Sequence, residues 1–367
     1  MIRSWGELAG RIAAARSSAG FTQGDLASKV GVDRTAVTKI EKGDRQVNSL
    51  ELARIADALA RPIQWFLMSP SRTVISRRNA REGVEKHADV VLELLAADVE
   101  QLREMGLLRP TNHEGLGPTV DSVEGAEQAA RLARDLLGSP AEPLLDLVRR
   151  VEELGLYAFV LDVESNVEGS YLSLAGGGGV ALVQGRDPSG KRRFTLAHEL
   201  GHHMLQDEYS TEWITGGKDE RERLISAFAI HFLLPRAGVG ARWRELDGAT
   251  DPRNAAIHVA AEHAVSWSAL CSQLANLELV TKDERARLAA APPSGLDFLE
   301  RKLQIHDVPA APAVPPGFMA AVASGYRRQL LGRQRALEML RGAVEDSALP
   351  EQHEVPLEDL IGDLDPS

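Results

Sequence analysis

Apolar residues recur at helical spacing through residues 5–67, in short runs that glycines separate. Thr22 and Asp33 come directly before two of these runs, where a short polar side chain caps a helix well. Gly31 and Gly43 follow the same two runs, where glycine ends a helix in a left-handed conformation. The pattern therefore predicts a bundle of five short helices at the start of the chain.

Further along the chain, longer helical patterns enclose two apolar runs of another kind. The runs at 156–163 and 179–185 are short and rich in Val, Leu and aromatic residues, which favours strands. Ala175 to Gly179 predicts a turn between them, since this run lacks the Lys-Ser/Thr of a phosphate-binding loop. The whole pattern predicts a mostly α fold with a small β-sheet, of the α+β class. Helices are expected over 84–107, 123–138, 140–154, 194–206, 219–234, several stretches up to about 290, and 317–342.

Turn-rich and proline-rich segments divide the chain into parts. A basic stretch follows the first bundle, the run RPTNHEGLGPTVDS interrupts the helical pattern near 110–121, and VPAAPAVPP forms a joint near the end. The expected organisation is an N-terminal domain over 1–70, a basic linker with a long helix over 71–120, a second domain over 121–290 and a helical tail over 291–367.

Charge is unevenly spread along the chain. Residues 1–81 hold 14 Lys and Arg against 7 Asp and Glu, whereas the whole chain has a net charge of −11. A basic head on an acidic body is typical of a nucleic-acid-binding domain joined to another module. A solvated basic surface beside a basic linker would give the same count, so charge alone leaves both interpretations open.

Cysteine usage and hydropathy indicate the cellular compartment in which the protein is expected. The single cysteine, Cys271, excludes an intrachain disulfide framework, which favours a reducing cytoplasm. The first residues contain no apolar core of signal-peptide length, and no run of about 18 apolar residues occurs. We therefore expect a cytoplasmic protein without a membrane partner.

Two of the predicted N-terminal helices have the spacing of a helix-turn-helix. The first covers Gln23–Lys29 and the second Asp33–Glu41, with a tight turn at Gly31. The outward positions of the second helix suit base edges and phosphates, and Gln23 and Lys42 suit phosphates. The outward positions are Arg34, Thr35, Thr38 and Lys39.

The run TQGDLASKVGVDRTAVTKIEKGDRQVNSLELARIADAL resembles the XRE (lambda-repressor-like) helix-turn-helix family. The resemblance implies a five-helix domain that binds a double-stranded DNA operator, and the motif geometry implies a homodimer on a two-fold site. It also implies that Gln23, Arg34, Thr35, Thr38 and Lys39 face DNA. A domain that serves protein interaction or dimerisation remains the alternative.

A second motif, HELGH, lies within the run RFTLAHELGHHMLQD. His198 and His202 are four residues apart on a predicted helix, so both imidazoles can reach one Zn²⁺ ion. Glu199 is placed to accept a proton from a water at that ion. Thr195 is a good N-cap for the helix, and Gly201 allows another segment to approach closely.

A catalytic zinc site needs a third protein ligand, and the segment KDERERLISAFAIHFLLP follows the motif closely. Here RRFTLAHELGHHML and ERLISAFAIHFLLP resemble the ImmA/IrrE family of metallopeptidases. Matching Phe228-Ala229 and Leu233–Pro235 to the family helix implies Glu222 as the third ligand, with Glu220 as the second choice. The chain departs from the family at the next positions, Leu224, Ile225 and Ser226, which brings the groups that orient the ligands into question.

Other polar side chains near the motif have weaker claims. His203 points about 140° away from His198 on a helical wheel, and His231 lies near the opposite face from Glu222; both are interpreted as structural. A peptidase also needs a donor for the oxyanion. The candidates are Tyr171, Tyr209, His258 and His263.

The two resemblances together imply a DNA-binding regulator that carries a zinc-dependent endopeptidase. Its substrate would be a repressor-type protein cleaved in a stress, prophage or defence response, with single-stranded DNA as a possible trigger. The strand at 179–185 could pair with an extended substrate. Two alternatives stay open: a transcription factor whose peptidase-like domain only senses a ligand or DNA, and the regulatory half of a toxin–antitoxin pair.

Overall fold

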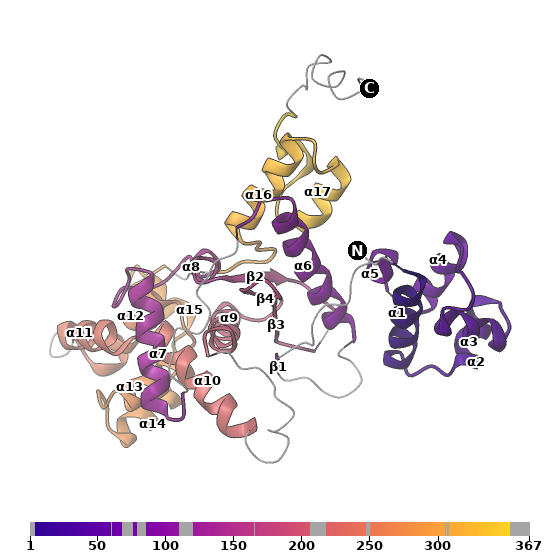
Figure 1. Cartoon of the computed structure of the whole chain (residues 1–367). Coiled ribbons are helices and arrows are strands. Elements are labelled where there is room, and N and C mark those ends of the chain that lie inside the picture. The colour runs from indigo at the N-terminus through magenta and orange to yellow at the C-terminus, as the bar shows by residue number, and fades with distance from the viewer. Residues whose placement is uncertain are drawn as a thin grey trace.

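The computed structural model describes residues 4–59, 61–67, 76–78, 86–109, 120–164, 166–205, 218–246, 250–304, 306 and 308–352. Within these residues helices predominate and one small mixed sheet lies among them, so the predicted α+β class is confirmed. The N-terminal helices form a bundle beside the remaining helices and the sheet (Figure 1). The bundle contacts α6 (Lys86–Glu104) through Trp65, whose indole N–H donates to the Glu93 carboxylate.

The N-terminal bundle consists of five short helices, as predicted. Thr22 caps α2 with its side chain, and Gly31 ends that helix at φ 75°. Gly43 ends α3 at φ 79°. Leu26 and Phe66 are fully buried at the centre. The helices are α1 (Trp5–Ser18), α2 (Gln23–Val30), α3 (Arg34–Lys42), α4 (Ser49–Ala58) and α5 (Ile63–Leu67).

The sheet has four strands in the order β1-β3-β4-β2. β2 and β4 are parallel, whereas β3 is antiparallel to both of its neighbours, β4 and β1. The strands are β1 (Ser76–Arg78), β2 (Leu156–Leu161), β3 (Gly169–Ser173) and β4 (Gly179–Gln184).

The expectation that the glycine-rich turn joins the runs at 156–163 and 179–185 is wrong. These runs form the parallel neighbours β2 and β4, and the turn instead joins β3 to β4, with Gly177 and Gly178 at φ 87° and 78°. β3 has the sequence GSYLS, in which only Tyr171 has a strong strand preference. Its strand character comes from pairing on both edges rather than from its own composition.

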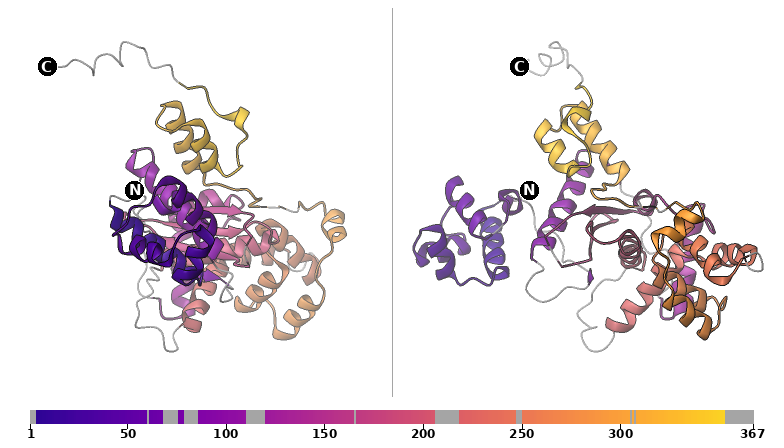
Figure 2. Two further views of the ribbon diagram at one scale, coloured as in Figure 1. Left: turned by 90° about the vertical axis from the view of Figure 1, so that its right-hand side faces the viewer. Right: turned by 180° about the vertical axis from the view of Figure 1, so that it is seen from behind.

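Alternate residues of the strands face two separate hydrophobic cores. Ala158 and Val183 face the core shared with α8 (Leu147–Glu153) and α9 (Ser189–Met204). Phe159 and Leu182 face the core shared with α6 and α16 (Pro316–Arg327). Because α6 and the C-terminal helices lie over one face of the sheet, that face is closed to solvent (Figure 2).

The predicted single helix over 317–342 is wrong, because this region forms two helices. α16 ends at Arg327, and α17 (Arg333–Leu340) begins after a turn in which Gln329 has φ 59°. Both helices contact the core under α6, which a single straight helix could not do. Asp98 of α6 is buried and accepts bonds from Arg335 at 2.5 Å and Arg341 at 2.6 Å.

The other helices lie on the opposite side of the sheet, where α10 packs directly against α9. The helix expected from residue 140 begins only at Leu147, because Pro140 and Pro143 lie in the segment before it. The remaining helices are α7 (Val123–Leu136), α10 (Lys218–Leu233), α11 (Arg236–Leu246), α12 (Pro252–His263), α13 (Trp267–Asn276), α14 (Lys282–Ala290) and α15 (Gly295–Glu300), with a 3₁₀ turn at Asp346–Ala348.

Among the helices that the structure describes, no single one has both the length and the apolar composition to cross a bilayer. Only the bent pair Glu220–Leu233 and Arg236–Leu246, taken together, has that length and composition.

His263 at the end of α12 is buried against α10. Its Nδ1–H donates to the Leu233 carbonyl at 3.1 Å. Burial lowers the pKa of His263 from 6.5 to about 4, and the nearby Arg134 and Arg193 act in the same direction. The imidazole is therefore neutral in the folded protein at neutral pH.

We expect the free energy of unfolding to fall as pH is lowered from about 6.5 to about 4. In that window the unfolded chain binds a proton at His263 that the folded chain does not, so acid favours unfolding by up to about 3 kcal/mol. Denaturant titrations at several pH values measure this slope. His263→Asn keeps a donor near the Leu233 carbonyl but does not titrate, so its profile should be flatter; an identical slope would contradict the assignment.

Candidate metal centre

The HELGH helix begins earlier than its sequence suggests. The expectation that Thr195 caps it is wrong, because α9 begins at Ser189 and Thr195 is buried inside it. Basic residues in the first turn of a helix are unfavourable, so the sequence pattern did not indicate that the helix begins at Ser189. Tertiary bonds compensate: Arg192 donates to the Gly185 carbonyl at 3.0 Å, and the buried Arg193 donates to carbonyls before α8.

The two motif histidines and Glu222 meet between α9 and α10. The Nε2 atom of His198 lies 3.1 Å from one Glu222 carboxylate oxygen, and Nε2 of His202 lies 3.8 Å from the other. One donor atom from each residue lies within 4.8 Å of the others. Two imidazoles and one carboxylate match the ligand set of a catalytic zinc site that leaves a position open, so the residues fit a zinc ion.

Glu199 lies between α9 and β3. It is fully buried. A Cβ atom added at Gly169 would lie 2.5 Å from a Glu199 carboxylate oxygen and 2.4 Å from the Thr195 methyl group. Glycine is therefore required at this position of β3, because any side chain would displace the Glu199 carboxylate from its place beside the histidines.

Two of the three residues that depart from the family pattern belong to the hydrophobic core. Leu224 and Ile225 are both buried. A Cβ at Gly201 would meet the Ile225 side chain at 2.8 Å. Gly201 thus allows α10 to approach α9 closely, and this close contact brings Glu222 to the histidines.

Ser226, the third departure, lies next to a ligand. Its hydroxyl is 3.4 Å from Nδ1 of His198, while Nε2 of the same ring faces Glu222. A ligating histidine usually donates its second N–H to an acceptor that fixes the ring. Ser226 can accept this N–H, so the substitution retains a group in the orienting position.

A hydrogen-bonded chain supports the other side of the site. His203 Nε2–H donates to the Leu154 carbonyl at 3.2 Å, which leaves Nδ1 to accept from the Tyr171 hydroxyl at 3.1 Å. The Tyr171 ring stacks on His202 with an angle of 12° between the rings. His203 thus positions Tyr171, and the Tyr171 hydroxyl donates its proton to His203 rather than into the site.

The remaining polar candidates lie elsewhere. His231 Nδ1 is 3.1 Å from Nε2 of Gln273, and His263 is bonded to the α10 backbone. His258 lies half-buried on α12. Tyr209 lies outside the described residues.

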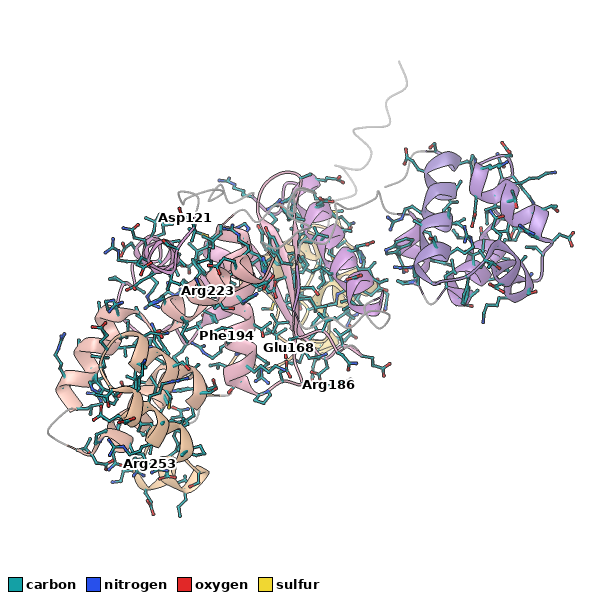
Figure 3. All side chains as sticks on the ribbon, turned by 90° about the horizontal axis from the view of Figure 1, so that it is seen from below. Asp121, Glu168, Arg186, Phe194, Arg223 and Arg253 are labelled. Atoms are coloured by element: carbon teal, nitrogen blue, oxygen red, sulfur yellow. The ribbon has the colours of Figure 1, made fainter. Side chains whose placement is uncertain are left out.

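A cleft of about 1180 Å³ is lined by residues of α9 and α10 that neighbour the candidate metal ligands. Ser226 and Phe194 line it, and the Phe194 ring centroid lies 6.4 Å from that of His198. Figure 3 labels Phe194 of α9, Arg223 of α10 and Glu168, the residue before β3, which all line this cleft. Ser226 links the cleft wall to the candidate site, because its hydroxyl lies 3.4 Å from Nδ1 of His198.

The expectation that the strand at 179–185 pairs with a substrate is wrong. β4 lies inside the sheet, with β2 on one edge and β3 on the other, so its hydrogen-bonding groups are already used. The runs of apolar residues that identify β4 as a strand also mark it as a buried central one.

The N-terminal bundle presents the residues expected at DNA. Arg34, Thr35, Lys39 and Lys42 are exposed on or beside α3. Gln23 and Thr38 are partly exposed and also join the two motif helices, because the Thr38 hydroxyl donates to the Gln23 side chain at 2.9 Å. Glu41 accepts from both Gln23 and Arg16, which fixes the angle between α1, α2 and α3.

Comparison with known families addresses both parts of the chain. A helix-turn-helix family model matches residues 12–66, and the peptidase M78 model, described as an IrrE N-terminal-like domain, matches residues 151–275. The two matches lie in separate parts of the chain and agree with the predicted fusion. The match to the IrrE N-terminal-like domain covers α9 and α10, and hence the residues that could hold a metal ion. The helix-turn-helix supports binding of double-stranded DNA, and the second module is metallopeptidase-like.

Comparisons with curated proteins and with solved structures do not identify a further family. No curated protein matches the chain. Among solved structures, the apo form of the competence regulator ComR from Streptococcus vestibularis aligns over 98% of this chain and 97% of its own, with 12% identity and a TM-score of 0.17.

Proposed function

We propose that the protein is a DNA-binding regulator whose IrrE N-terminal-like domain is a zinc-dependent endopeptidase acting on a repressor-type protein. The observation that carries this proposal is the convergence of His198, His202 and Glu222 beside the buried Glu199 and an open cleft. A domain that only senses a ligand would not need a general base buried beside a metal-ligand set. We infer a cytoplasmic homodimer, as the two-fold symmetry of many helix-turn-helix operators favours.

Each residue has a distinct part in the proposed reaction. His198, His202 and Glu222 would hold zinc, which supplies Lewis acidity to the reacting carbonyl and water. Glu199 accepts a proton on its carboxylate from the attacking water and returns it to the leaving amine. Tyr171 keeps the His202 ring in place, and Ser226 orients His198.

The substrate class is tested by incubating the zinc-loaded protein with a panel of helix-turn-helix repressors, with and without single-stranded DNA. Mass spectrometry of new chain termini identifies any cleaved bond. The Glu199→Gln protein in parallel separates this activity from contaminating peptidases. If no repressor is cut under any condition, the proposed substrate class is excluded.

We further propose that Arg34, Thr35, Thr38, Lys39, Lys42 and Gln23 form the DNA interface, with Arg34 reading a base. Arg34→Ala should weaken specific operator binding by about 1–3 kcal/mol, because it removes a base contact rather than a phosphate contact. Lys42→Ala is the matched control and should weaken specific and non-specific binding alike. Gel-shift titrations at fixed salt measure both; an unchanged affinity for Arg34→Ala would favour a protein-interaction role.

A further inference from the structure

The outer edge of β3 is the strand edge that lies beside the metal-ligand cluster. Gly169 of β3 adjoins Glu199, and Tyr171 of the same strand stacks on His202. The other edge of β3 is paired with β4. An extended peptide that added to this outer edge would therefore run directly past the general base and a metal ligand.

This edge is held by the chain itself. β1 pairs antiparallel with β3, with Arg78 opposite Gly169, Arg77 opposite Ser170 and Ser76 opposite Tyr171. β1 comes from the stretch that joins the N-terminal bundle, whose last helix ends at Leu67, to α6. Its backbone thus occupies the position that a peptide would take by strand addition.

We propose that the outer edge of β3 is the peptide-docking edge, and that residues 76–78 occupy it as an intramolecular competitor that a substrate must displace. This inference rests on the proposed peptidase function. Three paired residues form a short ladder, so the segment can be displaced. Its tether keeps it at a local concentration on the order of 1 mM, which is enough to compete with a weak peptide ligand.

The location of the competitor has a consequence for regulation. β1 lies in the chain between the DNA-binding bundle and α6, so the proposal connects the position of the bundle with the pairing of β1. Engagement of the bundle with DNA or with a partner is therefore coupled to access at the docking edge, without any contact between DNA and the metal site.

A reversible lock tests the proposal in the full chain. Arg77→Cys with Ser170→Cys places two cysteines directly opposite each other, at a cross-strand separation suited to a disulfide. The native Cys271 is buried, so the engineered pair reacts selectively. The background is zinc-loaded Glu199→Gln, and the probe is a fluorescein-labelled synthetic peptide with the sequence of residues 71–83, SRTVISRRNAREG.

We expect fluorescence anisotropy to show no peptide binding by the oxidised, locked protein and recovery of binding on reduction. Releasing the segment should have the opposite effect. The backbone N–H groups of alternate residues in a strand point to the same neighbouring strand, and proline has no N–H group. Either the single variant Arg77→Pro or the double variant Ser76→Pro/Arg78→Pro must therefore remove backbone hydrogen bonds to β3. That variant should bind the peptide about tenfold more tightly than the unmodified background, given the local concentration above.

The proposal is overturned if the disulfide fails to form, if the locked protein binds the peptide as tightly as the reduced one, or if neither proline variant gains affinity. Because the assay uses binding without turnover, its result is separate from that of the peptidase test. A protein that binds the peptide as expected but never hydrolyses any substrate would refute the proposed function and retain the docking edge.

Discussion

Glu199→Gln is expected to abolish peptide-bond hydrolysis, with a loss of about 10²–10⁴-fold in rate, while about one zinc remains bound per chain. The amide has nearly the shape of the carboxylate, so it fits the buried space against Gly169. It cannot accept a proton at neutral pH, which removes the general base and leaves the metal ligands intact. Zinc content by elemental analysis and cleavage by mass spectrometry measure the two quantities separately.

Glu220→Gln is the matched control for this experiment. Glu220 undergoes the same change of charge but is exposed and pairs with Arg223 at 2.7 Å, away from the ligand cluster. It should retain both zinc and activity. If Glu199→Gln cleaved at the rate of Glu220→Gln, the assignment of the general base would be wrong.

Glu222→Gln is expected to weaken zinc binding by more than about 100-fold. Loss of an outer partner of a ligand already costs about 10–100-fold in affinity, and Glu222 would contribute a ligand oxygen itself. Its carboxylate oxygens lie 3.1 Å from His198 Nε2 and 3.8 Å from His202 Nε2, and no second carboxylate of the described residues belongs to this cluster. Competition with a chromophoric zinc chelator measures the change in affinity.

Two further variants provide reference values for the loss of zinc affinity. Ser226→Ala should weaken zinc by about 10–100-fold, because it removes the hydroxyl beside the second nitrogen of His198. Glu220→Gln should bind zinc normally. An affinity loss for Glu220→Gln equal to that for Glu222→Gln would show that the ligand had been misplaced by two residues.

The DNA-binding module and the peptidase-like module are connected through α6 as well as through β1. Trp65 of the N-terminal bundle donates to Glu93, and Arg11 lies 3.7 Å from the same carboxylate. α6 in turn packs on the face of the sheet opposite α9. The linker region is thus part of the second module's structure as well as a tether.

Local signals in the sequence were sufficient for the helix-turn-helix. Its caps and stops at Thr22, Gly31 and Gly43 satisfy backbone groups within a few residues, so each can be recognised without knowledge of the rest of the fold. The start of α9 could not be recognised in this way. Its basic first turn is stabilised by bonds from Arg192 and Arg193 to carbonyls of distant segments.

Spacing also predicted the first two candidate metal ligands. His198 and His202 lie on one face of any helix that contains them, so their proximity needs only local structure. Glu222 required the family resemblance, because its distance from the histidines depends on the close packing of α10 on α9 at Gly201. The supporting contacts of Ser226 and of His203 with Tyr171 depend on the same packing.

The sequence by itself determined the α+β class, the helix-turn-helix spacing and a pair of candidate ligands, because these follow from short-range periodicity and local capping, and its family resemblances indicated the two modules. Only the tertiary structure decided which strand lies beside the site and which segment occupies its edge. β3 and β1 are short and weakly strand-forming, and their pairing depends on neighbours far away in the chain. No local pattern could encode that arrangement, since the hydrogen bonds that define it exist only after the sheet has assembled.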